Sequence, residues 1–268
     1  MTEPASAIQR HYGSDDLFDR IMYALAAAGH DIAHPTVEML YLVDQLHTGG
    51  IVSTKAQAEL AGVTNNMRAL DAGCGIGGGG RFLAHTYGCR VEAIDLTPTY
   101  VATAARLNTL CGLDQAITVR EGSVTDLPYP DRSFDLVWCQ NVSMNVADKR
   151  RMFAEACRVL VPGGRYTFSH AAQGPGGEPY YPTPWARDAS YSFLGTPEEI
   201  MALLKDAGFA VVKSRIEQIR PGGPQSGAEG LGPALAMGAD MPERQANMAR
   251  SLAENRLLFM QVVTERPA

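Results

Sequence analysis

The feature that most constrains this chain is a run of glycines directly after a short apolar segment. The sequence ALDAGCGIGGGG occupies residues 69–80 and contains six glycines. Glycine lets the backbone approach a ligand closely, and a helix that follows such a turn presents unpaired N–H groups at its start. A tight turn that only packs a helix on a strand needs one or two glycines. The run therefore predicts a strand, a ligand-binding turn and a helix.

Short β-branched segments alternate with longer helical patterns from about residue 68 to residue 215, which predicts an α/β fold with a parallel sheet. Most of the strand candidates are almost continuously apolar, as strands buried on both faces are. They are residues 68–72, 90–96, 117–121, 134–140, 164–170 and 210–216, and a further strand is expected over 257–264.

Composition excludes several classes of protein. The 268 residues include 23 basic and 29 acidic ones with no basic block, so we expect no nucleic-acid partner. No apolar run reaches the ~18 residues that span a bilayer, and the amino terminus lacks a secretory pattern, so we expect no membrane partner and a cytoplasmic location. The five cysteines are odd in number and widely spaced, which predicts neither a disulfide framework nor a metal site. The oligomeric state stays open.

Two carboxylates near the glycines indicate the kind of ligand. Gly73, Gly75 and Gly78 satisfy G-x-G-x-x-G, and Asp95 lies 20 residues beyond Gly75 at the end of the next predicted strand. This pattern fits a dinucleotide or any other adenosyl ligand, because the acid binds ribose hydroxyls in both cases. Asp71, two residues before the first glycine, favours a cationic ligand over an anionic pyrophosphate.

With Asp71 included, the segment resembles motif I of class I S-adenosylmethionine-dependent methyltransferases, D-x-G-C-G-x-G. Three later segments, 91–97, 121–140 and 158–168, resemble the family's following motifs in the same order. The resemblance implies a doubly wound Rossmann-like sheet, mostly parallel with an antiparallel C-terminal strand, plus an N-terminal helical cap. It also implies S-adenosyl-L-methionine as cofactor.

Carried over residue by residue, the resemblance assigns the cofactor-binding positions. Ser123 stands where the family commonly has an aspartate, and its hydroxyl can still accept a hydrogen bond from the adenine amino group. The core motifs implicate Asp71, Gly73, Cys74, Gly75, Asp95, Leu96, Gly122, Ser123, Val124 and Gln140.

The amino-terminal segments 11–21 and 42–50 resemble the cap of sarcosine/dimethylglycine N-methyltransferases and antibiotic-sugar O-methyltransferases. In those relatives a tyrosine and an H-x-G element close over the cofactor, which implicates Tyr12, His47 and Gly49. A histidine at the solvent-exposed end of a helix is the alternative interpretation of His47.

The acceptor of the methyl group is less constrained. Where the sugar O-methyltransferases carry histidines after the fourth strand, this chain has Met144 and Asn145. This difference favours an amine acceptor over a hydroxyl, with Asn145 and His170 as candidate catalytic groups. O-methylation with His170 as base is the alternative, and His170 could instead be a buried structural histidine. A catalytically silent cofactor-binding protein and an NAD-dependent oxidoreductase remain as alternatives of other classes.

A long Gly/Pro-rich loop over residues 173–193 is rich in aromatic residues. Aromatic faces attract cations, so the loop could form a cage for an ammonium substrate, and Arg187 could pair with a substrate carboxylate. The candidate substrate residues are Tyr181, Trp185 and Arg187. Packing of the loop against the cap is the alternative.

These features predict one domain with elaborations. The helical cap is expected over residues 1–66 and the cofactor-binding core over 67–216. Lid or substrate insertions are expected over 172–195 and 217–256, and the final strand over 257–264.

Overall fold

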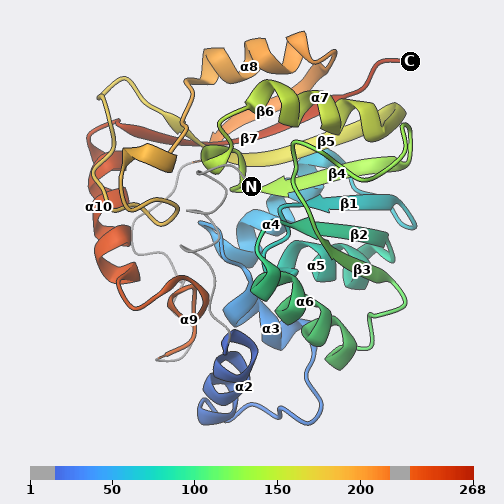
Figure 1. The fold of residues 1–268 in the computed structure, drawn as a ribbon, viewed down its shortest axis with the longest axis vertical. Helices are drawn as coiled ribbons and strands as arrows, with labels where there is room; N and C mark the ends of the chain where they lie inside the picture. Colours follow the sequence, from blue (N-terminus) through green and yellow to red (C-terminus); the bar gives the residue numbers. More distant parts are fainter. Residues whose placement is uncertain (1–15, 218–229) are drawn as a thin grey trace.

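The computed structural model describes residues 16–217 and 230–268 and contains a seven-stranded sheet in the order β3-β2-β1-β4-β5-β7-β6 (Figure 1). All neighbouring strands pair in parallel except those beside β7, which is antiparallel to both β5 and β6. The predicted sheet, mostly parallel with an antiparallel C-terminal strand, is confirmed. The strands are β1 (Arg68–Ala72), β2 (Arg90–Asp95), β3 (Ile117–Glu121), β4 (Phe134–Gln140), β5 (Leu160–Gln173), β6 (Ala210–Glu217) and β7 (Leu257–Glu265).

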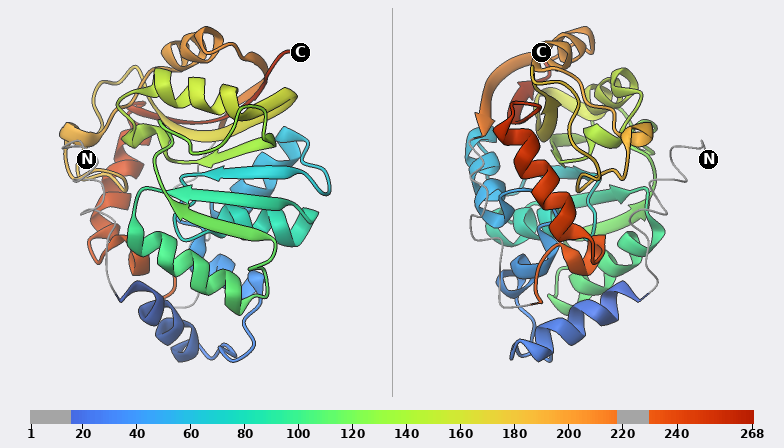
Figure 2. Two further views of the ribbon diagram at one scale, coloured as in Figure 1. Left: turned by 45° about the vertical axis from the view of Figure 1, so that its right-hand side comes forward. Right: turned by 90° about the vertical axis from the view of Figure 1, so that its left-hand side faces the viewer.

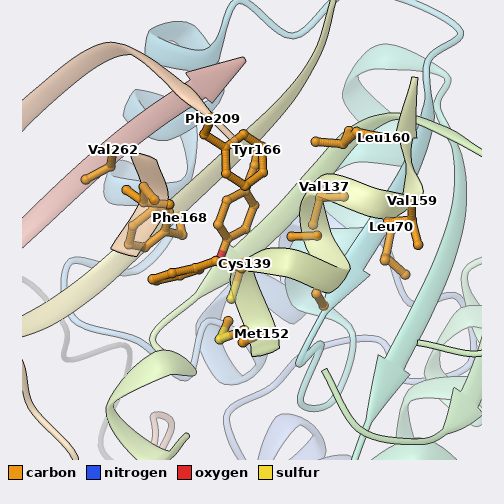
Figure 3. Close-up of a cluster of buried hydrophobic side chains, with 14 of the residues drawn as sticks. Leu70, Val137, Cys139, Met152, Val159, Leu160, Tyr166, Phe168, Phe209 and Val262 are labelled. Carbon is orange, nitrogen blue, oxygen red and sulfur yellow. The ribbon is translucent and has the colours of Figure 1, made fainter. Parts of the chain in front are cut away.

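Each face of the sheet is covered by its own hydrophobic cluster. On one face, α7 (Lys149–Val159) and α8 (Pro197–Asp206) cover a cluster that includes Tyr166, Phe168 and Phe209 (Figure 3). On the other face, α4 (Gly50–Ala61) and α5 (Gly78–Tyr87) cover a second cluster. Alternation along β1 explains the division, because Leu70 and Ala72 belong to the first cluster and Ala69 to the second.

The remaining helices extend the core beyond the sheet. Helices α2 (Leu17–Ala27), α3 (Val37–Asp44), α6 (Pro98–Leu110) and α9 (Ala234–Met237) share one apolar cluster. Helix α10 (Met241–Ala253) packs against β7 and lies with α9 on the side toward which the β4 arrow points (Figures 1 and 2). Within the described ranges, no helix has the length and apolarity needed to cross a bilayer.

The helix starts follow the sequence signals in part. Thr196 and Glu199 form the predicted capping box before α8. Thr97 and Asp240 stand at the starts of α6 and α10, but neither side chain caps its helix. The Asp240 carboxylate instead accepts hydrogen bonds from Arg244 at 2.7 and 2.9 Å. Thr97 before Pro98 and Asp240 three residues before Glu243 are sequence patterns typical of helix caps, but the structure does not use either side chain as a cap.

Candidate active site

A cavity of about 620 Å³ lies where β1, β2, β3 and β4 end. Ligands bind at this edge of open α/β sheets, because the loops that follow parallel strands converge there. The described wall also includes residues between 44 and 48, residues between 141 and 148 after β4, residues 184–185, the α6 residue Tyr100 and the α9 residue Met237. Eleven of the predicted cofactor residues line this one cavity: His47, Asp71, Gly73, Cys74, Gly75, Asp95, Leu96, Gly122, Ser123, Val124 and Gln140.

The glycine turn after β1 requires its glycines for two reasons. Gly73 has φ +79°, in the left-handed region that favours glycine. A Cβ at Gly73 would also lie 2.3 Å from Cγ2 of Val142, and a Cβ at Gly79 would lie 2.9 Å from Nε1 of Trp138. The backbone therefore passes closer to its neighbours than a side chain would allow, and the turn forms a wall of the cavity.

Asp95 holds the glycine turn from the end of β2. Its Oδ2 accepts a hydrogen bond from the Gly75 N–H at 2.8 Å, and its Oδ1 accepts one from the Thr97 N–H at 2.9 Å. Burial raises the pKa of this carboxyl above its usual range, and the two N–H groups oppose that rise. The carboxylate thus shapes the turn and also faces the cavity.

Asp71 presents an unsatisfied acceptor. Its side chain is 3% exposed, and Oδ2 has no hydrogen-bond partner among the described residues. Burial raises the pKa of the Asp71 carboxyl to about 7. Since a buried acceptor without a partner is costly, the position suits a ligand that brings a donor or a positive charge.

A fully buried ion pair supports the turn from behind, and the sequence analysis missed it. Nη2 of Arg81 lies 2.9 Å from Oδ2 of Asp44, which lines the cavity. Arg81 also donates to the carbonyl of Ile76 at 2.6 Å and to Oδ1 of Asn108 at 2.9 Å. The only local sign of this ion pair in the sequence is the position of Arg81 beside the apolar residues of α5. That position does not indicate that Asp44 is its partner.

His47 lies in the cavity wall within a hydrogen-bonded network. Its Nδ1 is 3.2 Å from the carbonyl of Thr48, and its Nε2 is 2.9 Å from Oγ1 of Thr54. Burial lowers the pKa of His47 to about 4, so the ring is neutral at pH 7. The Thr54 hydroxyl donates its proton to Oε1 of Gln45 at 2.7 Å, so Gln45 also belongs to this network. Gln140 extends the network, because its Nε2 donates to the same hydroxyl oxygen at 3.2 Å.

One predicted cofactor residue among the described ones, Gly49, does not line the cavity. Gly49 is the residue before α4, with φ +88°, and a Cβ there would lie 2.7 Å from Cβ of Ser53. Its role is in the backbone turn that begins the helix. Tyr12 lies outside the described residues. Ser123 lines the cavity, but its hydroxyl contacts Oγ1 of Thr125 at 2.8 Å.

His170 does not reach the cavity. It lies on β5 and is 0% exposed, Nδ1 is hydrogen-bonded to the Ser143 hydroxyl, and Nε2 has no partner among the described residues. Burial, together with the charge of Lys149, lowers its pKa to about 3. The expectation of an accessible base at the end of the fifth strand is therefore corrected: the histidine is sealed between the sheet and the segment after β4.

The burial of His170 predicts a measurable pH dependence of stability. The ring stays neutral in the folded protein but takes a proton near pH 6.5 in the unfolded chain. Its contribution is present above pH 6.5 and is lost as pH falls toward 3, by about 1.4 kcal/mol per pH unit. The free energy of unfolding of His170→Gln should therefore fall less steeply than that of the wild type between pH 6.5 and 4.5, measured by urea denaturation.

The raised pKa of Asp71 has the opposite effect on stability between pH 4 and 7, so only the difference between variant and wild type isolates His170. Ser143→Ala is the matched control, because it removes the hydrogen bond and keeps the histidine. Its pH profile should keep the wild-type slope. Identical slopes for His170→Gln and the wild type would show that the folded protein protonates this ring.

Of the other residues predicted to bind the acceptor, two line the cavity and two do not. Asn145 lines the cavity, but its Nδ2 donates to the carbonyls of Trp185 and Tyr191 at 3.0 and 3.1 Å. Trp185 lines the cavity and is 3% exposed. Tyr181 packs instead in an apolar cluster with Trp185, and Arg187 forms an ion pair with Asp240 at 2.9 Å. The contacts match packing of the loop better than an aromatic cage around an ammonium ion.

The known proteins that this chain resembles include methyltransferases. Residues 70–168 match a family model described as a methyltransferase domain. The chain is 36% identical over 140 residues to the sarcosine/dimethylglycine N-methyltransferase of Halorhodospira halochloris, covering 52% of this chain and 50% of that protein. It is 31% identical over 173 residues to a phosphoethanolamine N-methyltransferase of Triticum aestivum, covering 64% and 34%. The chain thus spans about half, or less, of the length of these relatives.

Among solved structures, a geranyl diphosphate C-methyltransferase from Streptomyces coelicolor A3(2), in complex with Mg²⁺, geranyl-S-thiolodiphosphate and S-adenosyl-L-homocysteine, is similar with a TM-score of 0.71. The match covers 99% of this chain and 98% of that chain at 18% identity. At this identity the likeness shows the fold alone.

Proposed function

We propose that this chain, whose residues 70–168 match a methyltransferase domain, is a class I methyltransferase that transfers a methyl group from S-adenosyl-L-methionine to a small-molecule acceptor. One observation carries the proposal. The glycine turn, the Asp95 carboxylate and the unpartnered Oδ2 of Asp71 meet at the same cavity.

The residues present fit that cofactor. Gly73, Gly75 and Gly79 line the cavity with backbone alone, and a Cβ at Gly73 or Gly79 would collide with Val142 or Trp138. Asp95 faces the cavity at the end of β2, where an acid binds ribose hydroxyls in adenosyl sites. The unpartnered Oδ2 of Asp71 suits a ligand that brings a donor or a positive charge, whereas the buried Asp44 carboxylate is already paired with Arg81.

S-adenosyl-L-methionine supplies a methyl group on a positively charged sulfur that a nucleophile can attack. The protein's own contribution is to orient two ligands and exclude water, which lowers a bimolecular barrier without covalent catalysis. The well-packed loop with Trp185 closes one side of the cavity, and Asn145 holds that loop in place. His47, neutral at pH 7, is the titratable imidazole in the described wall.

We further propose an amine as acceptor. A neutral amine attacks without help, whereas a hydroxyl needs a base. The burial of His170 removes the base on which O-methylation was expected to depend. The N-methyltransferases among the relatives support the same choice. Turnover of hydroxyl acceptors alone would contradict it, as measured by S-adenosyl-L-homocysteine release from a panel of amines, amino acids and sugars.

Asp95→Asn should weaken binding of S-adenosyl-L-methionine by at least tenfold, measured by calorimetry. The amide keeps one acceptor oxygen but loses the negative charge and the second acceptor that hold Gly75 and Thr97. A tenfold loss corresponds to about 1.4 kcal/mol, the size of one charge-assisted hydrogen bond.

Glu121→Gln is the matched control, because Glu121 pairs with Asp95 across β2 and β3 but is exposed. This control should bind as tightly as the wild type. The same titrations with NADH test the oxidoreductase alternative, and tight cofactor binding without methyl transfer to any acceptor would support the silent binding protein. Unchanged affinity in Asp95→Asn would remove Asp95 from the cofactor site.

A further inference from the structure

The part of the cavity wall that lies away from the glycine turn is mainly apolar. It is built from four segments distant in the sequence: the residues after α3, the segment after β4, the loop before α8, and α9. Their apolar lining residues are Leu46, Met144, Val146, Pro184, Trp185 and Met237. Met144, Trp185 and Met237 are 1%, 3% and 7% exposed, so the wall is packed from behind and can bury an apolar ligand.

The wall beside Trp185 is held in a fixed position. Asn145 Nδ2 binds the Trp185 and Tyr191 carbonyls, and the indole N–H of Trp185 donates to Oγ of Ser192 at 3.0 Å. The N–H of Phe193 donates to the carbonyl of Met144 at 2.7 Å. These bonds attach the loop to the segment after β4, so the apolar surface is preformed, which lowers the entropic cost of binding.

The charged groups of the described wall are all acidic. Asp44, Asp71, Asp95 and Asp148 line the cavity, and no lysine or arginine does so among residues 16–217 and 230–268. Asp44 is already paired with Arg81, and burial raises the pKa of Asp71 to about 7. An acceptor with a carboxylate or phosphate would therefore meet like charges at Asp95 and Asp148 and no cation in the described wall.

The cations near this wall already have partners. Arg81 pairs with Asp44, and Arg187 pairs with Asp240. Nζ of Lys149 donates to the carbonyls of Val146 and Phe193. These contacts compete with an anionic acceptor for the cations.

We propose that the acceptor is an amine on a predominantly apolar body that carries neither a carboxylate nor a phosphate group. This inference rests on the proposed methyltransferase function and narrows its substrate class. It differs from what the names of the relatives would suggest, since sarcosine, dimethylglycine and phosphoethanolamine each carry a carboxylate or a phosphate group. The segments that build the apolar wall lie mostly outside the matched methyltransferase domain, where acceptor specificity is free to differ between relatives.

Matched pairs of acceptors test the proposal directly. Phenethylamine and phenylalanine share an aromatic body and an amine and differ by one carboxylate. We expect S-adenosyl-L-homocysteine release with a kcat/KM at least tenfold higher for phenethylamine, and no release above background with sarcosine or phosphoethanolamine. The opposite preference, or no turnover of phenethylamine and of longer alkylamines, would overturn the inference.

The outcomes also separate this inference from the proposed function. Turnover of sarcosine or phosphoethanolamine would overturn the substrate class but support methyl transfer. Failure to bind S-adenosyl-L-homocysteine in calorimetry would instead count against the function itself.

A charge placed in the wall gives a second, independent readout. Val146→Arg adds a cation to the cavity, and Val146→Met is the matched control of similar length without charge. We expect the ratio of kcat/KM for phenylalanine to that for phenethylamine to rise at least tenfold in the arginine variant and to stay unchanged in the methionine variant. An unchanged ratio in an arginine variant that binds S-adenosyl-L-homocysteine normally would overturn the inference. If that variant lost cofactor binding, the wild-type panel would decide.

Discussion

Gly73→Ala should weaken binding of S-adenosyl-L-methionine by at least a hundredfold and destabilise the protein. The added Cβ would lie 2.3 Å from Cγ2 and 2.9 Å from Cγ1 of Val142, a branched side chain that also lines the cavity. Overpacking of this kind costs about 1–3 kcal/mol, and the left-handed conformation at φ +79° adds about 1–2 kcal/mol for a residue with a Cβ. Relief of the clash would move Val142 or the turn into the cofactor's space. Calorimetry and urea denaturation measure the two effects.

Gly29→Ala separates the backbone strain from the clash. Gly29 has φ +83°, close to that of Gly73, but nothing lies within 4 Å of the position its Cβ would take, and it does not line the cavity. This variant should lose only the stability that the left-handed conformation costs and should bind cofactor normally. Normal binding by Gly73→Ala would mean that the turn after β1 does not contact the ligand.

The strands could be predicted from the sequence because burial on both faces leaves an apolar signature. β1 and β4, which are mostly buried, begin and end at the predicted residues. β3 does so too, although it is an edge strand in which only Ile117 is buried. The start of β5 was placed at Gly164, whereas pairing with β4 begins at Leu160. Pro162 and two glycines in this stretch are typical of a turn, and only the register with β4, which shifts after Phe134, shows that the strand includes them.

Helix α4 was not predicted, for a different reason. It begins after a glycine with no side-chain cap, and its buried side includes Ser53, Thr54 and Gln57. Such a helix has no apolar stripe for a sequence pattern to detect. Its polar side is buried because partners from other parts of the chain satisfy it: Thr54 binds Gln45, and Gln57 donates to the carbonyl of Cys139.

The same distinction separates the two halves of the candidate site. The glycine turn and Asp95 are local features of strand ends, so their positions at the cavity could be predicted. Other features of the site depend on contacts between segments some 27 to 53 residues apart, which a single sequence does not specify. They are the burial of His170 beside Ser143, the ion pair of Arg187 with Asp240, and the hydrogen bonds from Asn145 to the carbonyls of Trp185 and Tyr191.

Arg81→Met should lower the free energy of unfolding by about 3–5 kcal/mol, the range for removing one partner of a buried ion pair. Both side chains of the Arg81–Asp44 pair are 0% exposed. The methionine would leave the Asp44 carboxylate without its cation and leave the Ile76 carbonyl and the Asn108 amide oxygen without a donor. Burial already raises the pKa of Asp44, and loss of the guanidinium would raise it further, so the carboxyl should take up a proton on folding. Urea denaturation measures the loss.

Arg150→Met provides the matched control, because Arg150 pairs with Asp206 at 3.0 Å but the two side chains are 66% and 52% exposed. Exposed pairs contribute about 0–1 kcal/mol, so this variant should unfold within that range of the wild type. The double variant Arg81→Met/Asp44→Asn should recover part of the loss, because an uncharged amide no longer needs a cation in a buried place. Equal losses for Arg81→Met and Arg150→Met would show that water reaches the pair behind the glycine turn. Asp44 would then present a solvated carboxylate to the cavity and not one held in a fixed position by Arg81.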